Sequence, residues 1–292
     1  MKIISAQRSP VAVKKPLPKK DSGKPSSESF SDALKTVRRV ALLGDFGDMA
    51  RRPTISDVEI IVCFADIRGF TRYCNRLQQK SLDNRIQNFL KDYLEIYSLA
   101  VLTEVCHLET ETKYGKTELR RVIIPTTYKN LGDGVMLIWE LPASASKLIQ
   151  GLASHYILKV LFTIYRLFVS RFHRARNVGV DAYSDEVKEL ELGFGVARGH
   201  AWKLNFGHHV KFDYAGSVVN LAARLSDKAR PHGIICQYEL SHALFDRFRI
   251  KKIGNQLSFN LKGLGKRQAF AFSKREIEAL WSKSDIWKEA VE

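Results

Sequence analysis

The sequence predicts an α+β fold in which helices cover an antiparallel or mixed sheet. Short apolar segments typical of strands alternate with amphipathic segments typical of helices along most of the 292 residues. Some neighbouring segments are joined by tight turns and others by long connections, so both hairpins and crossovers are expected. A doubly wound sheet would need crossovers throughout, and we therefore favour the α+β class.

The first half of this fold is expected to contain a central strand, a helix and a hairpin. Residues 57–66, DVEIIVCFAD, are apolar enough for a buried strand. Apolar side chains recur at helical spacing over residues 81–105, which predicts an amphipathic helix. Residues 119–130, LRRVIIPTTYKN, are interpreted as a strand, joined by the tight turn 131–134 to a second strand at 135–139.

The second half repeats this mixture of helices and strands. A long helix is expected at residues 144–176 and a shorter one at 215–229, the latter opened by Gly216 and Ser217. A polar amphipathic helix is expected to close the chain. The remaining strands are predicted at residues 190–199, 233–237, 256–262 and 267–272.

The charge distribution separates a basic tail from the rest of the chain. Residues 1–40 hold ten Lys and Arg against three Asp and Glu, together with half of the prolines. We therefore predict that residues 1–45 are a disordered basic tail with a short lead-in helix, and that residues 46–292 form one domain. The net charge of +16 would attract a polyanion, such as a nucleic acid, an acidic membrane or a nucleoside triphosphate.

The four cysteines are scattered and show no spacing typical of a zinc site or a disulfide framework. A reducing, cytoplasmic location is the simplest expectation. The longest apolar run, at residues 156–169, contains two charged residues and is too short to span a bilayer. We expect it to belong to the core or to a dimer interface.

Two carboxylates at the ends of predicted strands are the first candidates for chemistry. Asp66 ends the first strand, and Asp133 lies in the hairpin turn. Taken singly, the first could cap a helix and the second could belong to an ordinary turn. If the two strands pair, both carboxylates can converge on one site for Mg²⁺ or Mn²⁺. The adjacent segment IRGF offers backbone N–H groups at a helix start, with Gly69 permitting close approach of a phosphate.

Three longer motifs occur in a fixed order: FADIRGFT at 64–71, KNLGDGVM at 129–136 and FDYAGSVVNLAARL at 212–225. Together they resemble the class III nucleotidyl cyclases, the adenylate and guanylate cyclase family, over about residues 56–275. The resemblance implies a ferredoxin-like or palm-like sheet covered by helices, in a homodimer. It also implies conversion of a nucleoside triphosphate into a 3′,5′-cyclic nucleotide second messenger and pyrophosphate.

The resemblance further implies roles for individual residues. Asp66, Ile67 and Asp133 match the ligands of two divalent metal ions, Mg²⁺ or Mn²⁺. Asn220 and Arg224 match the pair that orients the ribose and stabilises the transition state. The remaining matches are substrate contacts: Lys129 and Asp213 for the base, Lys262 for the outgoing phosphates, and Phe64, Ile67, Arg68, Gly69 and Phe70 around the turn.

In this family the metal ligands and the base-reading residues of one site come from different chains. The present chain holds both sets, which implies a homodimer with two equivalent composite sites. Because Asp66, Asp133 and Arg224 are all in place, a catalytically inactive relative is disfavoured. No nucleic-acid-binding motif is recognised, so no nucleic acid is expected as a partner. The cyclic product would act on a separate effector.

The base is the open question. Lys129 donates a hydrogen bond and Asp213 accepts one, which suits adenine but equally suits uracil and cytosine. The two metal-binding aspartates lie 67 residues apart, which is long for the family, and no sensor domain is recognised. A stand-alone soluble cyclase of this size resembles the pyrimidine cyclases of bacterial antiphage defence. We therefore expect a product of cUMP or cCMP, with the ATP-to-cAMP reaction as the alternative.

Overall fold

The computed structural model describes residues 54–111, 116–143, 146–173, 185–205, 212–230, 233–240, 254–273 and 275–277. The chain divides into two compact units, Met1–Arg52 and Pro53–Glu292, and every described residue belongs to the second. The basic tail and lead-in helix predicted at 1–45 and the predicted closing helix therefore lie outside the described residues, apart from a short helical turn at 275–277.

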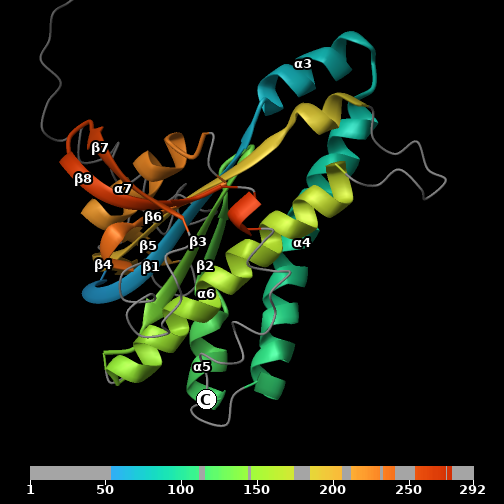
Figure 1. Ribbon diagram of the computed structural model, residues 1–292. Coiled ribbons are helices and arrows are strands. Elements are labelled where there is room, and N and C mark those ends of the chain that lie inside the picture. The colour runs from blue at the N-terminus through green and yellow to red at the C-terminus, as the bar shows by residue number, and fades with distance from the viewer. Residues whose placement is uncertain are drawn as a thin grey trace, which may run out of the picture. The chain divides into compact units, whose positions relative to one another are not determined.

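An eight-stranded sheet forms the centre of this unit (Figure 1). Its order is β2-β3-β1-β4-β6-β8-β7, with β5 pairing beside β4. The β4–β6 pair is parallel and the other pairs are antiparallel, so the mixed α+β architecture is confirmed. The strands are β1 (Thr54–Arg68), β2 (Thr127–Asn130), β3 (Gly134–Leu141), β4 (Glu191–Asn205), β5 (Phe212–Ala215), β6 (Ile234–Gln237), β7 (Asn255–Leu261) and β8 (Gly265–Phe272).

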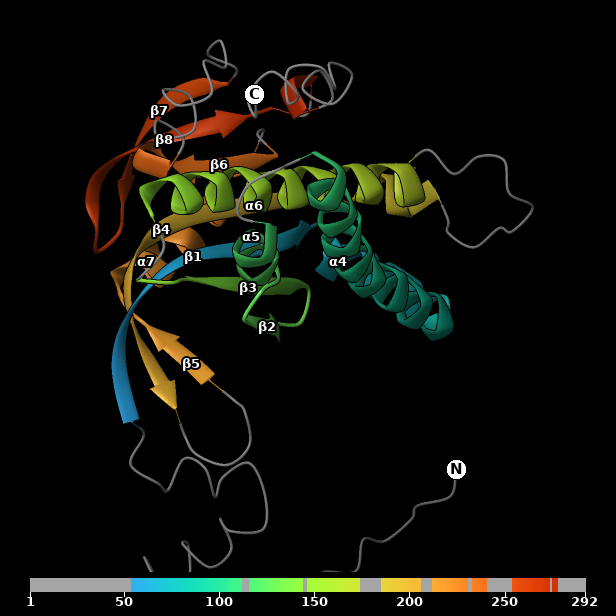
Figure 2. The same cartoon turned by 90° about the horizontal axis from the view of Figure 1, so that it is seen from below.

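Helices cover both faces of the sheet because β1 is apolar on both sides. Ile61 and Cys63 point into the core that is shared with α4 (Asp83–Glu111) and α6 (Lys147–Phe168). Ile60 and Val62 alternate with them and pack under α7 (Ser217–Asp227). Figure 2 shows α4 and α6 lying together across the sheet. A run of consecutive apolar residues thus serves two layers at once.

The long apolar helix is a core element. Helix α6 continues into a π-helical turn, η1 (Val169–His173), and the predicted helix of 144–176 is confirmed over these residues. The helical segment Ile149–His173 is long and apolar enough to cross a membrane. This corrects the expectation that the apolar run at residues 156–169 is too short to do so. However, 89% of its most apolar stretch is buried inside the protein. All four cysteines are free, as predicted.

The strand predicted at 119–130 is wrong in its first half. Residues Lys116–Ile123 form helix α5, and only Thr127–Asn130 form a strand. The reason is helical spacing: Leu119, Val122 and Ile123 are buried while the intervening arginines are exposed. The apolar run and its β-branched residues had favoured a strand, whereas the buried face follows the helical period.

Helix α7 lies so close to the sheet that only glycine fits beneath it. A Cβ atom on Gly195 of β4 would lie 2.1 Å from the Ala222 carbonyl oxygen and 2.0 Å from the Ser226 nitrogen, both backbone atoms of α7. Neither atom can move away alone, because each is held in the helix. The close approach therefore sets the height of α7, which carries two of the predicted site residues, above the sheet.

We predict that Gly195→Ala lowers the free energy of unfolding by about 1–3 kcal/mol or more, because the added methyl group forces α7 off the sheet. Gly199→Ala is the matched control, since a Cβ there meets Val218 at an ordinary 3.5 Å. Chemical denaturation of both variants measures the difference. Equal stability of the two variants would show that α7 is not pinned at Gly195.

Candidate active site

The two predicted metal ligands converge, as the sequence had led us to expect. Strands β1 and β3 pair antiparallel, and their register places Asp66 opposite Gly134, the residue that follows Asp133. The backbone N–H of Ile67 donates a hydrogen bond to the Asp133 carbonyl oxygen at 3.3 Å. The hairpin turn is therefore fastened beside the end of β1, and the two carboxylates face one region.

The environment of Asp66 favours a bound cation. Burial, the largest influence, raises the pKa of the Asp66 carboxyl from its ordinary 3.8; the Arg68 guanidinium opposes this shift, and the Asp133 carboxylate adds to it. Arg68 Nη1 lies 2.7 Å from Asp66 Oδ2. A partly buried carboxylate beside a second carboxylate gains stability from any positive charge placed between them.

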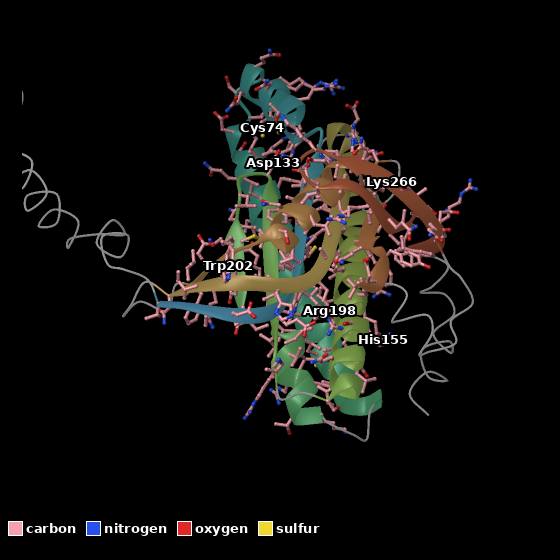
Figure 3. All side chains as sticks on the ribbon, turned by 90° about the vertical axis from the view of Figure 1, so that its left-hand side faces the viewer. Cys74, Asp133, His155, Arg198, Trp202 and Lys266 are labelled. Atoms are coloured by element: carbon pink, nitrogen blue, oxygen red, sulfur yellow. The ribbon has the colours of Figure 1, made fainter. Side chains whose placement is uncertain are left out.

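A cleft of about 430 Å³ opens beside the aspartates. It is lined by the turn between β1 and helix α3 (Phe70–Gln79), by Asp133 and by the segment around Glu189. Gly69 makes the turn with φ +86°, a left-handed conformation that suits glycine. Figure 3 shows Asp133 and Cys74 of α3 at the same end of the sheet. Burial raises the pKa of the Cys74 thiol, and the Asp133 carboxylate adds to this shift.

The start of α3 gives the cleft an affinity for anions. The first backbone N–H groups of a helix have no partner within the helix, and its dipole favours negative charge there. Acidic side chains are absent from the first turn of α3. The cleft also contains cationic side chains that the sequence prediction missed: Arg72 and Arg76 of α3, and Arg230 after α7. Arg72 and Arg76 stand four residues apart, a spacing that could have signalled a shared helix face.

The donor set fits Mg²⁺ or Mn²⁺ that is bound together with a substrate. Within the described residues, no group of three or more His, Cys, Asp or Glu side chains could hold a metal ion. Mg²⁺ is commonly bound through one or two carboxylates, with waters and substrate phosphates as its other ligands. The Asp66–Asp133 pair next to an anion-attracting turn provides this combination.

Three predicted residues of the turn can contribute only in part. The Ile67 side chain is 2% exposed and belongs to the core, so only its backbone is available to a ligand. The Phe70 ring packs toward the same core, beside Tyr73 and Phe89. Phe64 is half-buried against the cluster under α7. The backbone N–H of Phe70, at the first position of α3, remains its contribution to the cleft.

The two residues predicted to read the base contact each other. Lys129 Nζ donates to Asp213 Oδ1 at 2.6 Å, although the two residues lie on different strands, β2 and β5. The same Asp213 oxygen accepts the backbone N–H of Tyr214 at 2.8 Å, which fixes its position. Both side chains stay partly exposed, Lys129 by 34% and Asp213 by 46%, so a ligand can still reach them.

Lys129 and Asp66 lie on the same face of the sheet. Lys129 is opposite Met136 in the β2–β3 pair, and Met136 is opposite Phe64 in the β3–β1 pair. Residues directly opposite in a sheet point to one face, and Asp66 follows Phe64 by two residues on the same strand. The Lys129 and Asp66 side chains therefore project from the face covered by α7.

The transition-state pair and Lys262 stand apart from the cleft. Asn220 and Arg224 are exposed on the outer face of α7, whose opposite face buries Val218, Ala222 and Leu225. Arg224 Nη1 lies 3.5 Å from Asp227 Oδ2 in the same helix. Lys262 is exposed in the turn between β7 and β8. Within one chain, the described part of the structure thus places these three residues outside the lining of the cleft.

Comparisons with known proteins give structural neighbours of one kind. No protein-family model matches the chain, and no curated protein matches it. The adenylyl cyclase CyaB from P. aeruginosa aligns at 20% identity and a TM-score of 0.48, covering 76% of this chain and 97% of that one. A bacterial light-regulated adenylyl cyclase aligns at 17% identity and a TM-score of 0.49, covering 91% and 67%.

The guanylyl cyclase Cya2 aligns at 17% identity and a TM-score of 0.49, covering 74% of this chain and 92% of that one. These three structures are adenylyl and guanylyl cyclases.

The raised pKa of Asp66 predicts a pH dependence of cation binding. A proton and a cation compete for the same carboxylate oxygens, so Mn²⁺ affinity should fall as the pH decreases, beginning above the ordinary Asp pKa of 3.8. Calorimetric titration of the nucleotide-free protein with Mn²⁺ from about pH 7 to about pH 4 measures this. Circular dichroism at each pH controls for unfolding. A constant affinity over that range would contradict the raised pKa.

Proposed function

We propose that this chain is a nucleotidyl cyclase that converts a nucleoside triphosphate into a 3′,5′-cyclic nucleotide and pyrophosphate. The observation that carries the proposal is the pairing of β1 with β3. It brings Asp66 and Asp133 together beside the anion-attracting start of α3, in a cleft lined by arginines. A site that holds cations on one side and phosphates on the other suits a metal–triphosphate substrate.

The chemistry needs positioning and charge neutralisation more than covalent help from the protein. Bound divalent metal ions would lower the pKa of the ribose 3′-hydroxyl and neutralise phosphate charge. Asp66 and Asp133 hold the positive charge in place, and the backbone N–H groups of the turn after Gly69 orient phosphate oxygens. Lys129 and Asp213 orient the base. Arg224 opposes the negative charge that develops on the α-phosphate.

The arrangement supports a homodimer with composite sites. Asn220 and Arg224 face outward from α7, where a second chain could meet them. The cleft with the aspartates opens elsewhere on the same chain. A two-fold dimer would allow the cleft of each chain to receive Lys129, Asp213, Asn220 and Arg224 from its partner, which forms two equivalent sites.

The geometry around the base supports several nucleotides. The Lys129–Asp213 pair presents one donor and one acceptor, on strands β2 and β5. Adenine, uracil and cytosine each offer an acceptor next to a donor. The expected pyrimidine product, with its role in antiviral signalling through a separate cytoplasmic effector, stays a prediction. ATP is the second candidate, because Lys129 and Asp213 match the residue types of adenylate cyclases.

Incubation with Mn²⁺ and each of ATP, GTP, CTP and UTP tests the activity and the base together. We expect a cyclic nucleotide and pyrophosphate, with the highest rate for a pyrimidine triphosphate. Mass spectrometry identifies the product. A clear preference for ATP would overturn the pyrimidine expectation but keep the cyclase. A lack of cyclic product from all four nucleotides, in a folded dimer, would refute the proposed function.

Substitutions test the composite site. Asp66→Ala and Asp133→Ala should abolish turnover, and Arg224→Ala should lower kcat by roughly 10³-fold or more with little change in KM. Folding is checked by circular dichroism.

An equal mixture of Asp66→Ala and Arg224→Ala chains should recover roughly a quarter of wild-type activity, because half of the dimers carry one intact site of two. Lack of recovery in proven mixed dimers would contradict the shared site.

A further inference from the structure

Arg68 makes contacts that its place in the turn did not predict. It is the last residue of β1 and lies two residues after Asp66, on the same face of the sheet. Its Nη1 is 2.7 Å from Asp66 Oδ2, and its Nη2 donates to the carbonyl oxygen of Ser226. Ser226 belongs to the last turn of α7. One guanidinium thus joins a predicted metal ligand to the end of a helix on another part of the chain.

A bound cation would affect the two contacts of the Arg68 guanidinium differently. The Ser226 carbonyl oxygen also accepts the Ala229 backbone N–H at 3.0 Å, and it lies at the negative end of the helix dipole, so the Arg68 contact there suits a cation. The Asp66 contact uses an oxygen that a divalent cation would also need. The Arg68 guanidinium lies 2.7 Å from that oxygen, so its positive charge repels a cation that approaches Asp66. Cation binding must therefore compete with Arg68.

The surroundings of Arg68 leave space for its side chain to move and favour such a movement. Its side chain lines both the 430 Å³ cleft and a second cavity of about 190 Å³ between the end of α6 and β4. Its Nε is buried, and among the described residues no acceptor lies within hydrogen-bond reach of it. A buried donor without an acceptor is unfavourable, and a phosphate oxygen in the cleft could supply that acceptor.

We propose that Arg68 is a positioning residue that holds Asp66 against the end of α7 while no cation is bound and releases it when a cation arrives. The released guanidinium keeps the Ser226 carbonyl and turns Nη1 to a phosphate oxygen of the substrate. The inference rests on the proposed function, because it takes Asp66 as a metal ligand. It adds a direct link between Asp66 and α7, the helix that carries Asn220 and Arg224.

Mn²⁺ binding to the nucleotide-free protein tests the competition without measuring activity. Arg68→Gln should bind Mn²⁺ roughly threefold to tenfold more tightly, because a contacting positive charge is removed. Arg230→Gln is the matched control: Arg230 lies in the same cleft and acts on Asp66 by its charge, but its Nε pairs with Glu191 Oε2 at 3.3 Å. It should change the affinity by less than twofold or so.

Two results would separate the possible failures. If Asp66→Ala binds Mn²⁺ as well as the wild-type protein does, then the metal assignment and the proposed function fail. If Asp66→Ala loses binding while Arg68→Gln matches the wild-type protein or Arg230→Gln, then only the role of Arg68 is overturned.

Hydrogen exchange tests the link to α7. In the wild-type protein, Mn²⁺ should speed amide exchange in the last turn of α7, around Ser226, because the tether from Asp66 through Arg68 is broken. In Arg68→Gln the same amides should exchange quickly whether or not Mn²⁺ is present. Arg68→Lys keeps the charge without the forked guanidinium and should resemble Arg68→Gln in exchange but lie closer to wild type in Mn²⁺ affinity. If Mn²⁺ does not change the exchange rate of these amides in the wild-type protein, the proposed link between Asp66 and α7 is overturned.

Discussion

The antiparallel pairing of β1 with β3 is the constraint on which the site depends. Its register sets Asp66 opposite Gly134, and the hydrogen bond from Ile67 to the Asp133 carbonyl closes the hairpin against the end of β1. A shift of one residue would turn Asp66 to the face covered by α4 and α6, because successive side chains of a strand point to opposite faces. The hydrogen bond from Ile67 to Asp133 belongs to this register and would be lost in a shifted one.

Negatively and positively charged side chains lie close together at this edge of the sheet. Two carboxylates lie together, and burial raises the pKa of one of them. Arginines surround them, and two of these are held by glutamates: Arg76 by Glu189 at 2.9 Å, and Arg230 by Glu191 at 3.3 Å. The cleft therefore offers negative charge at the aspartates and positive charge along its sides. A metal–triphosphate substrate carries the complementary pattern, with cations bound to an anionic chain.

The pairing of the strands and the distance of α7 from the sheet position the remaining candidate site residues. Pairing with β4 and β3 brings β5 and β2 close enough for Lys129 and Asp213 to contact each other, although the residues are 84 positions apart in the chain. The missing side chain of Gly195 lets α7 settle on β4, and the buried face of α7 leaves Asn220 and Arg224 outside. One chain thus displays two incomplete sets of residues, which is why we propose a site shared between two chains.

Much of this could be predicted from sequence because the signals are local. The apolar run before Asp66, the GDG turn and the helical spacing of Asn220 and Arg224 each follow from a few neighbouring residues. Local signals failed where burial decides: 119–123 form a helix, since its buried residues follow the helical period and not that of a strand. Arg230 and Glu189 carried no local signal, because they reach the cleft only through distant packing.

The sequence by itself determined the α+β class, the residue types that suit metal and phosphate, and the order of the three motifs. These depend on composition and on short-range periodicity, which folding does not alter. Only the tertiary structure decided that Lys129 contacts Asp213, that Arg68 joins Asp66 to α7, and that Ile67 can offer no side chain to a ligand. Those facts depend on register and on packing between segments far apart in the chain, and no short stretch of residues contains them.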